Sequence, residues 1–531
     1  MPEYLSSGVY VEEVATGLRP IEGVSTSTTG FVGQTERGPL RPRLVTSWDD
    51  FHSWFGGIVD PEVSYLPFAV CGFFNNGGQR LFIARVTRDD ARTSSLTLAT
   101  SDPEQDLVIS ASGPGAFGNG LFVRIQAGTH TGIRLTLWYY RTIPTTFADP
   151  TDASTVADPD GREPDTIEDY DNLGVQPNDA DYFLQRINVS SRLVSLAWSK
   201  SISPTARPDD LIYTPLAGGG DGSNPMTSAH FRGGTNTSPE RLEGLAGLGT
   251  INDISILSIP DEVNAALLPD VVDRDDIRNA MIDQCESLRN RFSILNVSGN
   301  SSDVTLIRPP RDSSYAAIYY PWIRVIDPRT SNTVLVPPSG HIAGIYARTD
   351  TKHGVHKAPA NEVLSGVVQD DIDAARKPLE FAITKHEQDI LNPRGINVIR
   401  DFRSVGRHIR VWGARTISSD PECRYVNVRR LLLFIEESID IGSQWVVFEP
   451  NDFRLWARVR QMISNFLVLI WRSGALQGEV EESAFFVKCD NTTMTQADID
   501  AGRLICTIGI APVKPAEFVI FRIQQHTLES R

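Results

Sequence analysis

The chain has 531 residues, of which 40% are hydrophobic and 22% are charged, and its formal net charge is −16. This length predicts about three or four domains, and the composition is that of a globular chain rather than a disordered one. Apolar runs such as 431–435 and 466–471 are far shorter than the roughly 20 residues of a membrane-spanning helix. We therefore do not expect the chain to insert directly into a membrane.

The start of the chain and its cysteines favour folding and first assembly in a cytoplasm. No basic residue precedes Arg19 and no apolar segment follows the first residues, so the pattern of a secretory signal is missing. The five cysteines are scattered and form no Cys-x-x-Cys pair, which predicts neither a disulfide framework nor a zinc site. They are Cys71, Cys285, Cys423, Cys489 and Cys506.

The charge is distributed unevenly along the chain. Between Arg394 and Arg472, thirteen arginines, no lysine and eight acidic residues give a local net charge of +5, which leaves −21 on the remainder. Such a segment predicts oriented contacts with an acidic partner. Because arginine without lysine favours fixed pairing with carboxylates, an acidic protein surface is favoured over nucleic acid.

The first residues have the pattern of an isolated strand. Within residues 4–14, Val9 and Val11 fall on one face of an extended segment, and Tyr10 and Glu12 fall on the other. Glycines and a proline then interrupt regular structure. A lone strand is not stable in water, so we expect residues 1–25 to form an arm that joins a sheet edge, either its own or a neighbour's.

Residues 26–90 have an α/β pattern. A strand is expected to begin at 31–32, and a short helix over 47–55 would take Ser47 as its N-cap. A helix over 65–74 is followed by Asn-Asn-Gly-Gly and by an apolar strand over 80–86.

Residues 91–216 predict an inserted β-rich domain, because short apolar runs alternate with Gly, Pro and Asp. The expected strands are 107–110, 121–126 and 133–140. Residues 149–171 are strongly acidic and are expected to form an exposed loop. The sequence AGGGDG at 217–222 predicts a flexible junction.

Residues 217–377 alternate between helical and strand patterns, which predicts a mainly parallel sheet with covering helices. The expected helices are 239–247 and 274–291, and the expected strands are 254–259, 292–297, 316–320 and 322–325.

The pattern changes again in residues 378–514. A strand-rich segment over 395–417 precedes two helices, 426–439 and 452–471. The second helix has an apolar stripe opposite a polar face of Arg454, Arg458, Gln461 and Asn465. Residues 515–531 form a second arm, in which 517–523 are apolar on both faces, as in a strand covered on both sides.

None of the chemical motifs predicts a catalytic, cofactor or metal site. His353 and His356 lack an indicated third ligand, and His386-Glu387 is not followed by the second histidine of a zinc protease helix. The glycines at 218–222 lack the Gly-Lys-Ser/Thr ending of a phosphate loop, and no Gly-x-Ser-x-Gly motif occurs. The acidic stretch 158–169 reads as a surface loop, although loose cation binding there stays open.

Several long motifs, taken in order, resemble the contractile tail sheath proteins of phages and related injection systems. They are GVYVEEV at 8–14, FVGQTERGP at 31–39, FFNNGGQRLFIARV at 73–86, NPRGINVIRDFRSVGRHIRVWGARTI at 392–417 and YVNVRRLLLFIEESI at 425–439. Together they cover roughly the first 90 and the last 140 residues.

The resemblance implies an α/β plus β multidomain fold. The first and last parts of the chain would form an inner α+β domain, 26–90 with 378–514, against a tail tube. The middle would hold the inserted β-rich outer domain and a non-catalytic α/β domain of subtilisin-like topology, 217–377. The extended arms would add strands to neighbouring subunits. The implied arm residues are Val9, Tyr10, Val11, Glu12, Phe518, Val519, Ile520 and Phe521.

The implied function is a helical sheath of many copies that contracts around an inner tube and drives it through a target envelope. The implied partners are the tube protein, a baseplate and a terminator or cap protein, without nucleic acid or cofactor, in a phage tail or an injection particle. Arg424, Arg429 and Arg430 are the residues expected to face the tube. Their alternative role is intrachain pairing with Glu436 or Glu437, or simple solvation.

Two other functions stay open on the sequence alone. The alternating middle region also fits an enzyme of the α/β hydrolase or protease kind, which would need a clustered nucleophile, base and acid. A ring-forming or capsid-like assembly protein is the third possibility.

Overall fold

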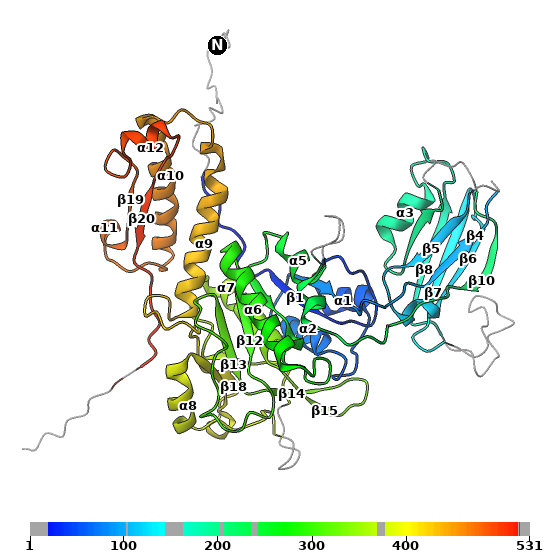
Figure 1. Ribbon diagram of the computed structural model, residues 1–531, viewed down its shortest axis with the longest axis horizontal. Coiled ribbons are helices and arrows are strands. Elements are labelled where there is room, and N and C mark those ends of the chain that lie inside the picture. The colour runs from blue at the N-terminus through cyan, green and yellow to red at the C-terminus, as the bar shows by residue number, and fades with distance from the viewer. Residues whose placement is uncertain are drawn as a thin grey trace, which may run out of the picture. The chain divides into compact units, whose positions relative to one another are not determined.

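The computed structural model of the chain (Figure 1) contains two compact units, and it describes residues 20–101, 105–143, 163–200, 207–234, 243–368, 377–518 and 520. The larger unit consists of Ser25–Gly354 and Ala358–Val426. The smaller unit consists of the described residues within Met1–Val24, Val355–Lys357 and Asn427–Arg531. In this part of the chain, none of the helices has both the length and the apolar character needed to cross a bilayer.

A nine-stranded sheet forms the centre of the larger unit. Its strands are β1 (Thr29–Gly33), β2 (Arg43–Val45), β3 (Leu81–Arg85), β11 (Ile256–Ser258), β12 (Phe292–Asn296), β13 (Ala316–Tyr320), β16 (Glu362–Val363), β17 (Ile396–Asp401) and β18 (Ile409–Val411). They lie in the order β16-β18-β17-β13-β12-β11-β1-β3-β2. The six strands from β17 to β3 are mutually parallel, and the outer three are antiparallel to their neighbours. The predicted mainly parallel sheet is confirmed.

Helices cover both faces of this sheet, which explains why β1, β11, β12 and β13 are buried at every position. On one face, Val32 belongs to a core that includes residues of α4 (Ser228–Arg232), α5 (Gly244–Gly249) and α6 (Val271–Leu288). On the other face, the Phe31 ring packs edge-on against Phe73 of α2 (Leu66–Asn75), with centroids 5.9 Å apart. Alternate residues of one strand therefore anchor opposite layers.

Two glycines allow α7 (Ser339–His353) to approach α2 closely. A Cβ atom at Gly340 would lie 2.4 Å from the Cα of Ala69, and one at Gly344 would lie 2.4 Å from the carbonyl oxygen of Phe73. Any larger side chain would push α7 away from α2, so this contact fixes one covering layer. The sequence had not indicated α7 as a helix.

The remaining elements of the larger unit outside the insertion are short. Ser47 caps α1 (Trp48–Phe55), as predicted, because its side chain accepts a hydrogen bond from the backbone N–H of Asp50 over 3.0 Å. The others are the hairpin β14 (Ile323–Ile326) and β15 (Thr333–Val336) and the helix α8 (Lys385–Leu391).

The residues between β3 and α4 form a β-rich region with its own core around Leu135 and Phe183. It holds β4 (Ser95–Leu98), β5 (Leu107–Ala111), β6 (Leu121–Ala127), β7 (Ile133–Tyr139), β8 (Thr166–Leu173), α3 (Phe183–Ser190), β9 (Val194–Trp198) and β10 (Leu211–Pro215). One sheet has the order β10-β6-β7-β8 and the other has the order β4-β5-β9.

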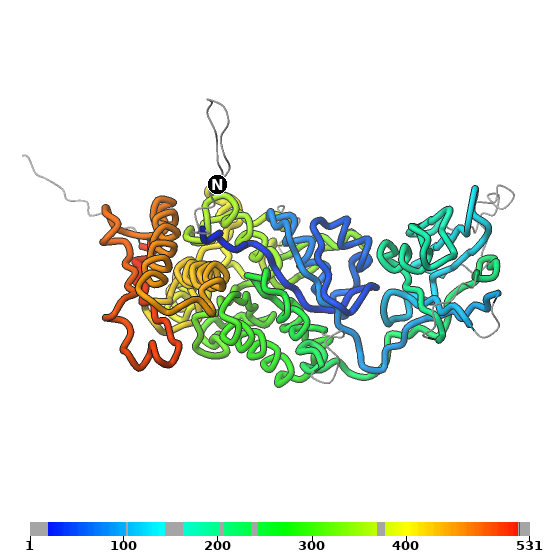
Figure 2. Tube along the Cα trace, turned by 90° about the horizontal axis from the view of Figure 1, so that it is seen from above, coloured from blue at the N-terminus to red at the C-terminus, as the bar shows by residue number. Residues whose placement is uncertain are grey.

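Two predictions about the insertion were wrong. The acidic stretch 149–171 is not a loop throughout, because its last part lies in the sheet-edge strand β8, where Asp169 forms an ion pair with Arg134. The glycine-rich segment 217–222 is not a free junction. Its backbone pairs with the incoming connection at the Arg92–Gly220 bridge, so the two connections visible in Figure 2 run side by side.

The smaller unit is a helical pair with a β-ribbon. It contains α9 (Val426–Ser443), α10 (Phe453–Arg472), α11 (Glu481–Ala484), α12 (Gln496–Asp500), β19 (Phe485–Lys488) and β20 (Thr507–Ile510). The apolar stripe of α10 is buried, as predicted, at Leu455, Val459, Met462, Phe466 and Ile470.

The structure divides the chain at other points than the sequence predicted. Strands β1 and β3, from 26–90, and β17, from 378–514, belong to the same sheet as β11 to β13. The expected boundary at 377/378 therefore does not separate two cores. Parallel pairing between distant segments, such as β13 with β17, leaves no trace in the local pattern that suggested the boundary.

The glycine contact between α2 and α7 can be tested by substitution. We expect Gly344→Ala to lower the free energy of unfolding by about 1–3 kcal/mol, because the clash outweighs the gain of roughly 1 kcal/mol in helix propensity. Urea denaturation followed by circular dichroism measures the difference. Gly220→Ala is the matched control, because a Cβ atom there meets nothing within 4 Å. Equal stability of the two variants would contradict this account of the contact.

Candidate functional site

The β19–β20 ribbon has two open edges. Its strands pair antiparallel from Phe485 opposite Ile510 to Lys488 opposite Thr507, and no other strand joins them within the described ranges. One face rests on the helical pair, with Phe485 buried at 6% exposure. An isolated two-stranded ribbon is marginally stable and leaves unpaired backbone donors and acceptors along its outer edges. The ribbon is therefore a template for added strands.

The outer face of the ribbon is apolar at one position. Phe486 is 49% exposed, and its ring lies over Gly509 on the opposite strand, where a Cβ atom would come within 2.2 Å of the ring. The glycine thus gives the aromatic ring a flat surface to cover, and the ring protects the backbone there from water.

The predicted arm residues lie only partly within the described chain. Phe518 and Ile520 are 71% and 79% exposed, and the described residues after 513 form no strand. Val519, Phe521 and the segment Val9–Glu12 lie outside the described residues. The pairing of both arms therefore stays a prediction.

The three arginines expected to face a tube are not equally available. Arg429 and Arg430 are only 8% and 3% exposed, whereas Arg424 is partly exposed. Arg429 donates a hydrogen bond to the carboxylate of Glu436 over 3.1 Å. The intrachain alternative is therefore the one that applies to Arg429. Both arginines belong to the fully buried run 426–431 at the start of α9, which a charge count cannot reveal.

The exposed positive charge of this unit lies on α10 instead. This helix carries four arginines and no acidic residue, and Arg454 and Arg458 are exposed on the predicted polar face. Arg458 lies over the Trp445 ring, 4.5 Å from its centroid, and 3.8 Å from the carboxylate of Glu449. Contact with the ring restricts the side chain without removing its charge.

An apolar surface lies where α9 turns into α10. Ile441, Val447, Phe448 and Phe453 are between 48% and 102% exposed. Phe448 is the most exposed of them, and its φ of +69° is a left-handed conformation that bulky residues rarely adopt. The sequence gives no sign of this surface, because its residues are divided between the end of α9, the connection after it and the start of α10, and do not share one periodic face. Contiguous exposed apolar residues are typical of protein contacts.

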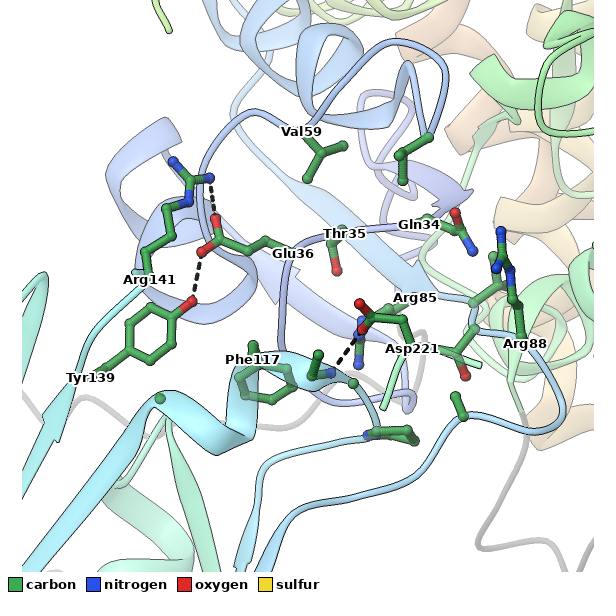
Figure 3. Close-up of a pocket in the computed structure, with 18 of the residues that line it drawn as sticks. Gln34, Thr35, Glu36, Val59, Arg85, Arg88, Phe117, Tyr139, Arg141 and Asp221 are labelled. Carbon is green, nitrogen blue, oxygen red and sulfur yellow. Dashed lines mark hydrogen bonds and ion pairs between the residues drawn. The ribbon is translucent and has the colours of Figure 1, made fainter. Parts of the chain in front are cut away.

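A cavity of 580 Å³ lies in the larger unit beyond the carboxyl ends of β1 and β3 (Figure 3). Its lining includes Gln34, Glu36, Arg85, Tyr139, Arg141 and Asp221. Ligands of parallel α/β sheets often bind at this end of the strands, so the chemistry of the lining is relevant.

The charged groups of this cavity already have partners. The Glu36 carboxylate accepts hydrogen bonds from Tyr139 Oη over 2.7 Å, from the Gly57 N–H over 2.8 Å and from Arg141 (Figure 3). Burial alone would raise the pKa of Glu36, but these hydrogen bonds and the Arg141 charge outweigh it and hold the pKa below its usual value. Since Tyr139 and Arg141 belong to the insertion, this cluster fastens the insertion to the end of β1.

The opposite wall is held in the same way. Arg85 is 3% exposed and donates to the Gly38 carbonyl over 2.8 Å, and burial lowers its pKa to about 10 despite the nearby Asp221 carboxylate. Asp221 accepts from the Ala116 N–H over 2.8 Å. The cavity walls are thus structural joints between segments, and they present no paired nucleophile and base.

Two adjacent carboxyls are buried at the end of β11. Asp261 accepts from the Ser64 hydroxyl and from the Tyr65 N–H, each over 2.6 Å, and burial raises its pKa to about 6. Burial likewise raises the pKa of Glu262 to about 7, although the Arg278 charge and hydrogen bonds from Asn296 oppose the shift. Both carboxyls tie loops to the sheet.

The arrangement of His341, His353 and His356 does not indicate a metal site or an acid–base pair. Burial lowers the pKa of His341 to about 4, and its Nδ1 makes no hydrogen bond within the described structure. His353 ends α7 and is exposed, and His356 is partly buried. Across the described ranges, no three His, Cys, Asp or Glu side chains are grouped so that they could hold a metal ion.

The sequence matches two domain families. Residues 263–417 match the phage tail sheath protein central domain, and residues 418–526 match the phage tail sheath C-terminal domain. A prophage protein of Pseudomonas aeruginosa (strain UCBPP-PA14), described as a major tail sheath protein, is 26% identical over 252 residues, which cover 47% of this chain and 61% of the relative. The tail sheath protein of Burkholderia phage BcepMu is 28% identical over 217 residues, 40% of this chain and 43% of the relative. Each alignment thus spans less than two thirds of the relative.

Solved structures share the fold over almost the whole chain. The helical sheath of the anti-feeding prophage in its contracted state is 24% identical with a TM-score of 0.56, and the match covers 98% of this chain and 100% of that one. The contracted sheath complex of an extracellular contractile injection system, PVC, is 22% identical with a TM-score of 0.56 and full coverage of both chains. A sheath tail protein of Listeria innocua is 13% identical with a TM-score of 0.56, covering 93% of this chain and 96% of that one.

The Glu36 cluster makes a prediction about pH. Because its folded pKa is depressed, the carboxylate stabilises the fold above its unfolded pKa of about 4.5, and this contribution is lost as the pH falls through the folded value. We expect Glu36→Gln to lower the free energy of unfolding by about 2 kcal/mol at pH 7, and we expect this difference from the wild type to shrink as the pH falls below 4.5. Denaturant titrations across this pH range measure the difference. Exposed Glu62→Gln is the control, and a pH-independent loss in Glu36→Gln would refute the assignment.

Proposed function

The chain belongs to the contractile tail sheath family, and from this premise we propose that it is a structural subunit of a contractile tail or injection particle. Many copies would polymerise as a helix around an inner tube and would contract to drive the tube through a target envelope. The family is structural rather than enzymatic. The observation that carries the proposal is the β19–β20 ribbon, which no further strand extends among the residues that the structure describes.

The terminal arms are the proposed occupants of these edges. The first arm would present Val9, Tyr10, Val11 and Glu12 in an extended segment, and the second arm would present Phe518, Val519, Ile520 and Phe521. Strand addition satisfies backbone groups that an isolated ribbon leaves unpaired. The 71% exposure of Phe518 supports this role, because an aromatic side chain with so little cover in one chain gains most from burial against another.

Such a joint would persist while subunits move. Each backbone hydrogen bond contributes only about 0.5–1.5 kcal/mol net, but an arm strand makes several at once. A hinge between the first arm and the body would lie before Ile21, because Ile21 is buried in the core of the smaller unit. Gly17 and Pro20 precede it in the sequence and favour a break in regular structure there. A body could then rotate during contraction while its arms stay paired with the neighbours.

The proposed tube contact is the exposed face of α10. Arg454 and Arg458 are exposed on a helix without acidic residues, so they can pair with carboxylates of an acidic tube surface. Arg424 remains a candidate because it is partly exposed. The apolar surface around Phe448 is proposed to be covered by another copy of the chain, since its exposure would be costly in a solitary subunit.

Finer features follow from the resemblance and are part of the proposal. They are an inner placement of the C-terminal region, outer placement of the insertion, a subtilisin-like arrangement of the middle segment, and a first assembly in the cytoplasm. Contraction would proceed from a metastable extended helix to a wider one with more burial and better charge pairing. A baseplate and a terminator protein would bound the polymer.

Deleting the arms tests the proposal. We expect loss of residues 1–16, or truncation after Pro515, to abolish polymers while leaving a folded soluble monomer, because each removes one strand donor. Size-exclusion chromatography and negative-stain microscopy measure both properties.

A pair of substitutions gives the matched control for this test. Val9→Asp with Val11→Asp should behave like the deletion, whereas Ser6→Asp with Ser7→Asp, which adds the same charge outside the alternating pattern, should assemble. Normal filaments from either arm deletion would overturn the proposal.

Charge reversal tests the tube contact. We expect Arg454→Glu with Arg458→Glu to reduce co-sedimentation with the purified tube about tenfold or more, because two attractive pairs become repulsive. Added salt should weaken wild-type binding in the same direction. Arg503→Glu is the control, since this exposed arginine lies outside α10. Unchanged binding by the double variant at low salt would rule out this face.

A further inference from the structure

Two cysteines that the sequence places 17 positions apart face each other across the ribbon. The register of β19 and β20 pairs Lys488 with Thr507, so the next opposed pair is Cys489 and Cys506. Both thiols are free in the structure. Directly opposed residues of antiparallel strands have Cα atoms about 4.5–5.5 Å apart, which lies within the range that a disulfide spans.

The surroundings of the pair favour reaction between the two thiols. Cys489 is fully buried in the core of the smaller unit, whereas Cys506 is partly exposed. Interaction between the two thiols lowers the pKa of Cys489, and the Arg460 charge lowers it further, whereas the same interaction and burial raise the pKa of Cys506 despite the Arg460 charge. The thiolate of the pair is therefore favoured at Cys489, the buried member and the nucleophile of the step that closes the disulfide.

We propose that Cys489 and Cys506 form an intrachain disulfide that locks the β19–β20 ribbon when the protein meets an oxidising medium. The oxidant would be a small disulfide such as oxidised glutathione, which can reach the partly exposed Cys506. Cys506, the thiol that the small disulfide can reach, gives up its proton and attacks one sulfur of that disulfide. One small thiol leaves with the proton, and a mixed disulfide remains.

The second step completes the exchange. Cys489 attacks the Sγ of Cys506, a protein disulfide forms, and the second small thiol leaves. The protein loses two protons and two electrons, and the small disulfide gains both as two thiols. The disulfide closes the loop that connects β19 to β20 and contains α12. It ties the two strands together at the end of the ribbon where this loop begins and ends.

The other cysteines provide internal controls. Cys285 lies in the buried core of the larger unit, and burial raises the pKa of its thiol to about 12, so it should not react in the folded chain. Cys71 and Cys423 are partly exposed, but each lies outside any opposed pair of described strands. They can become alkylated or form mixed disulfides, but they should not cross-link within the chain.

The experiment uses the full-length protein. The reduced chain is incubated with oxidised glutathione, quenched with an alkylating agent, digested and mapped by mass spectrometry. We expect a single cross-linked peptide pair that joins Cys489 to Cys506, with Cys285 free. Oxidation should raise the melting temperature of the wild type by about 5 °C and should leave Cys489→Ser with Cys506→Ser unchanged.

Other outcomes would overturn the inference. A glutathione adduct that persists on Cys506 without transfer to Cys489 would show that the thiols cannot reach bonding geometry. Disulfide-linked dimers on a non-reducing gel would assign the reactivity to contacts between chains. The mapping is made on the wild type, so it does not depend on the folding of a variant. It is also independent of assembly, so its failure would leave the proposed sheath function in place.

Discussion

The pairing of backbone groups along the β19–β20 ribbon is the constraint on which the functional account depends. Two strands that rest on a helical pair bury one face, yet they leave donors and acceptors along both outer edges in the described chain. A soluble monomer normally covers or blunts such edges. Here the chain instead has apolar termini, which an assembly could pair with the edges of other copies. Such a pairing would need little side-chain specificity, and it would tolerate rotation of the bodies that it joins.

The larger unit fits the role of a rigid body in such a mesh. Its parallel sheet is covered on both faces, and α2 and α7 touch through glycines. The insertion is fastened through Glu36 and through the paired connections at Arg92 and Gly220, rather than hanging from a free linker. A unit whose parts are held together by such contacts can transmit force from one of its surfaces to another. The cavity beyond β1 is explained by these joints, because its charged residues are already engaged with one another.

Local patterns in the sequence predicted much of this fold. Ser47 capping, the buried stripe of α10 and the strands of the insertion all follow from short-range chemistry that one sequence displays. The features that the sequence did not predict depend on contacts between residues far apart in the chain. They are the pairing of β13 with β17, the tethering of residues 217–222 and the burial of Arg429 and Arg430. The opposition of Cys489 and Cys506 was likewise not predictable from the sequence, because only the pairing register of β19 and β20 brings the two residues together. Family motifs indicated the function, because no local pattern distinguishes an arm strand from any other strand.

A high-resolution map of the assembled polymer tests the central claim most directly. The account predicts that the outer edges of β19 and β20 are each extended by an arm strand from a different copy, so that three chains share one sheet. A map in which residues 1–19 and 521–531 return to their own subunit, while both ribbon edges face solvent, would contradict it.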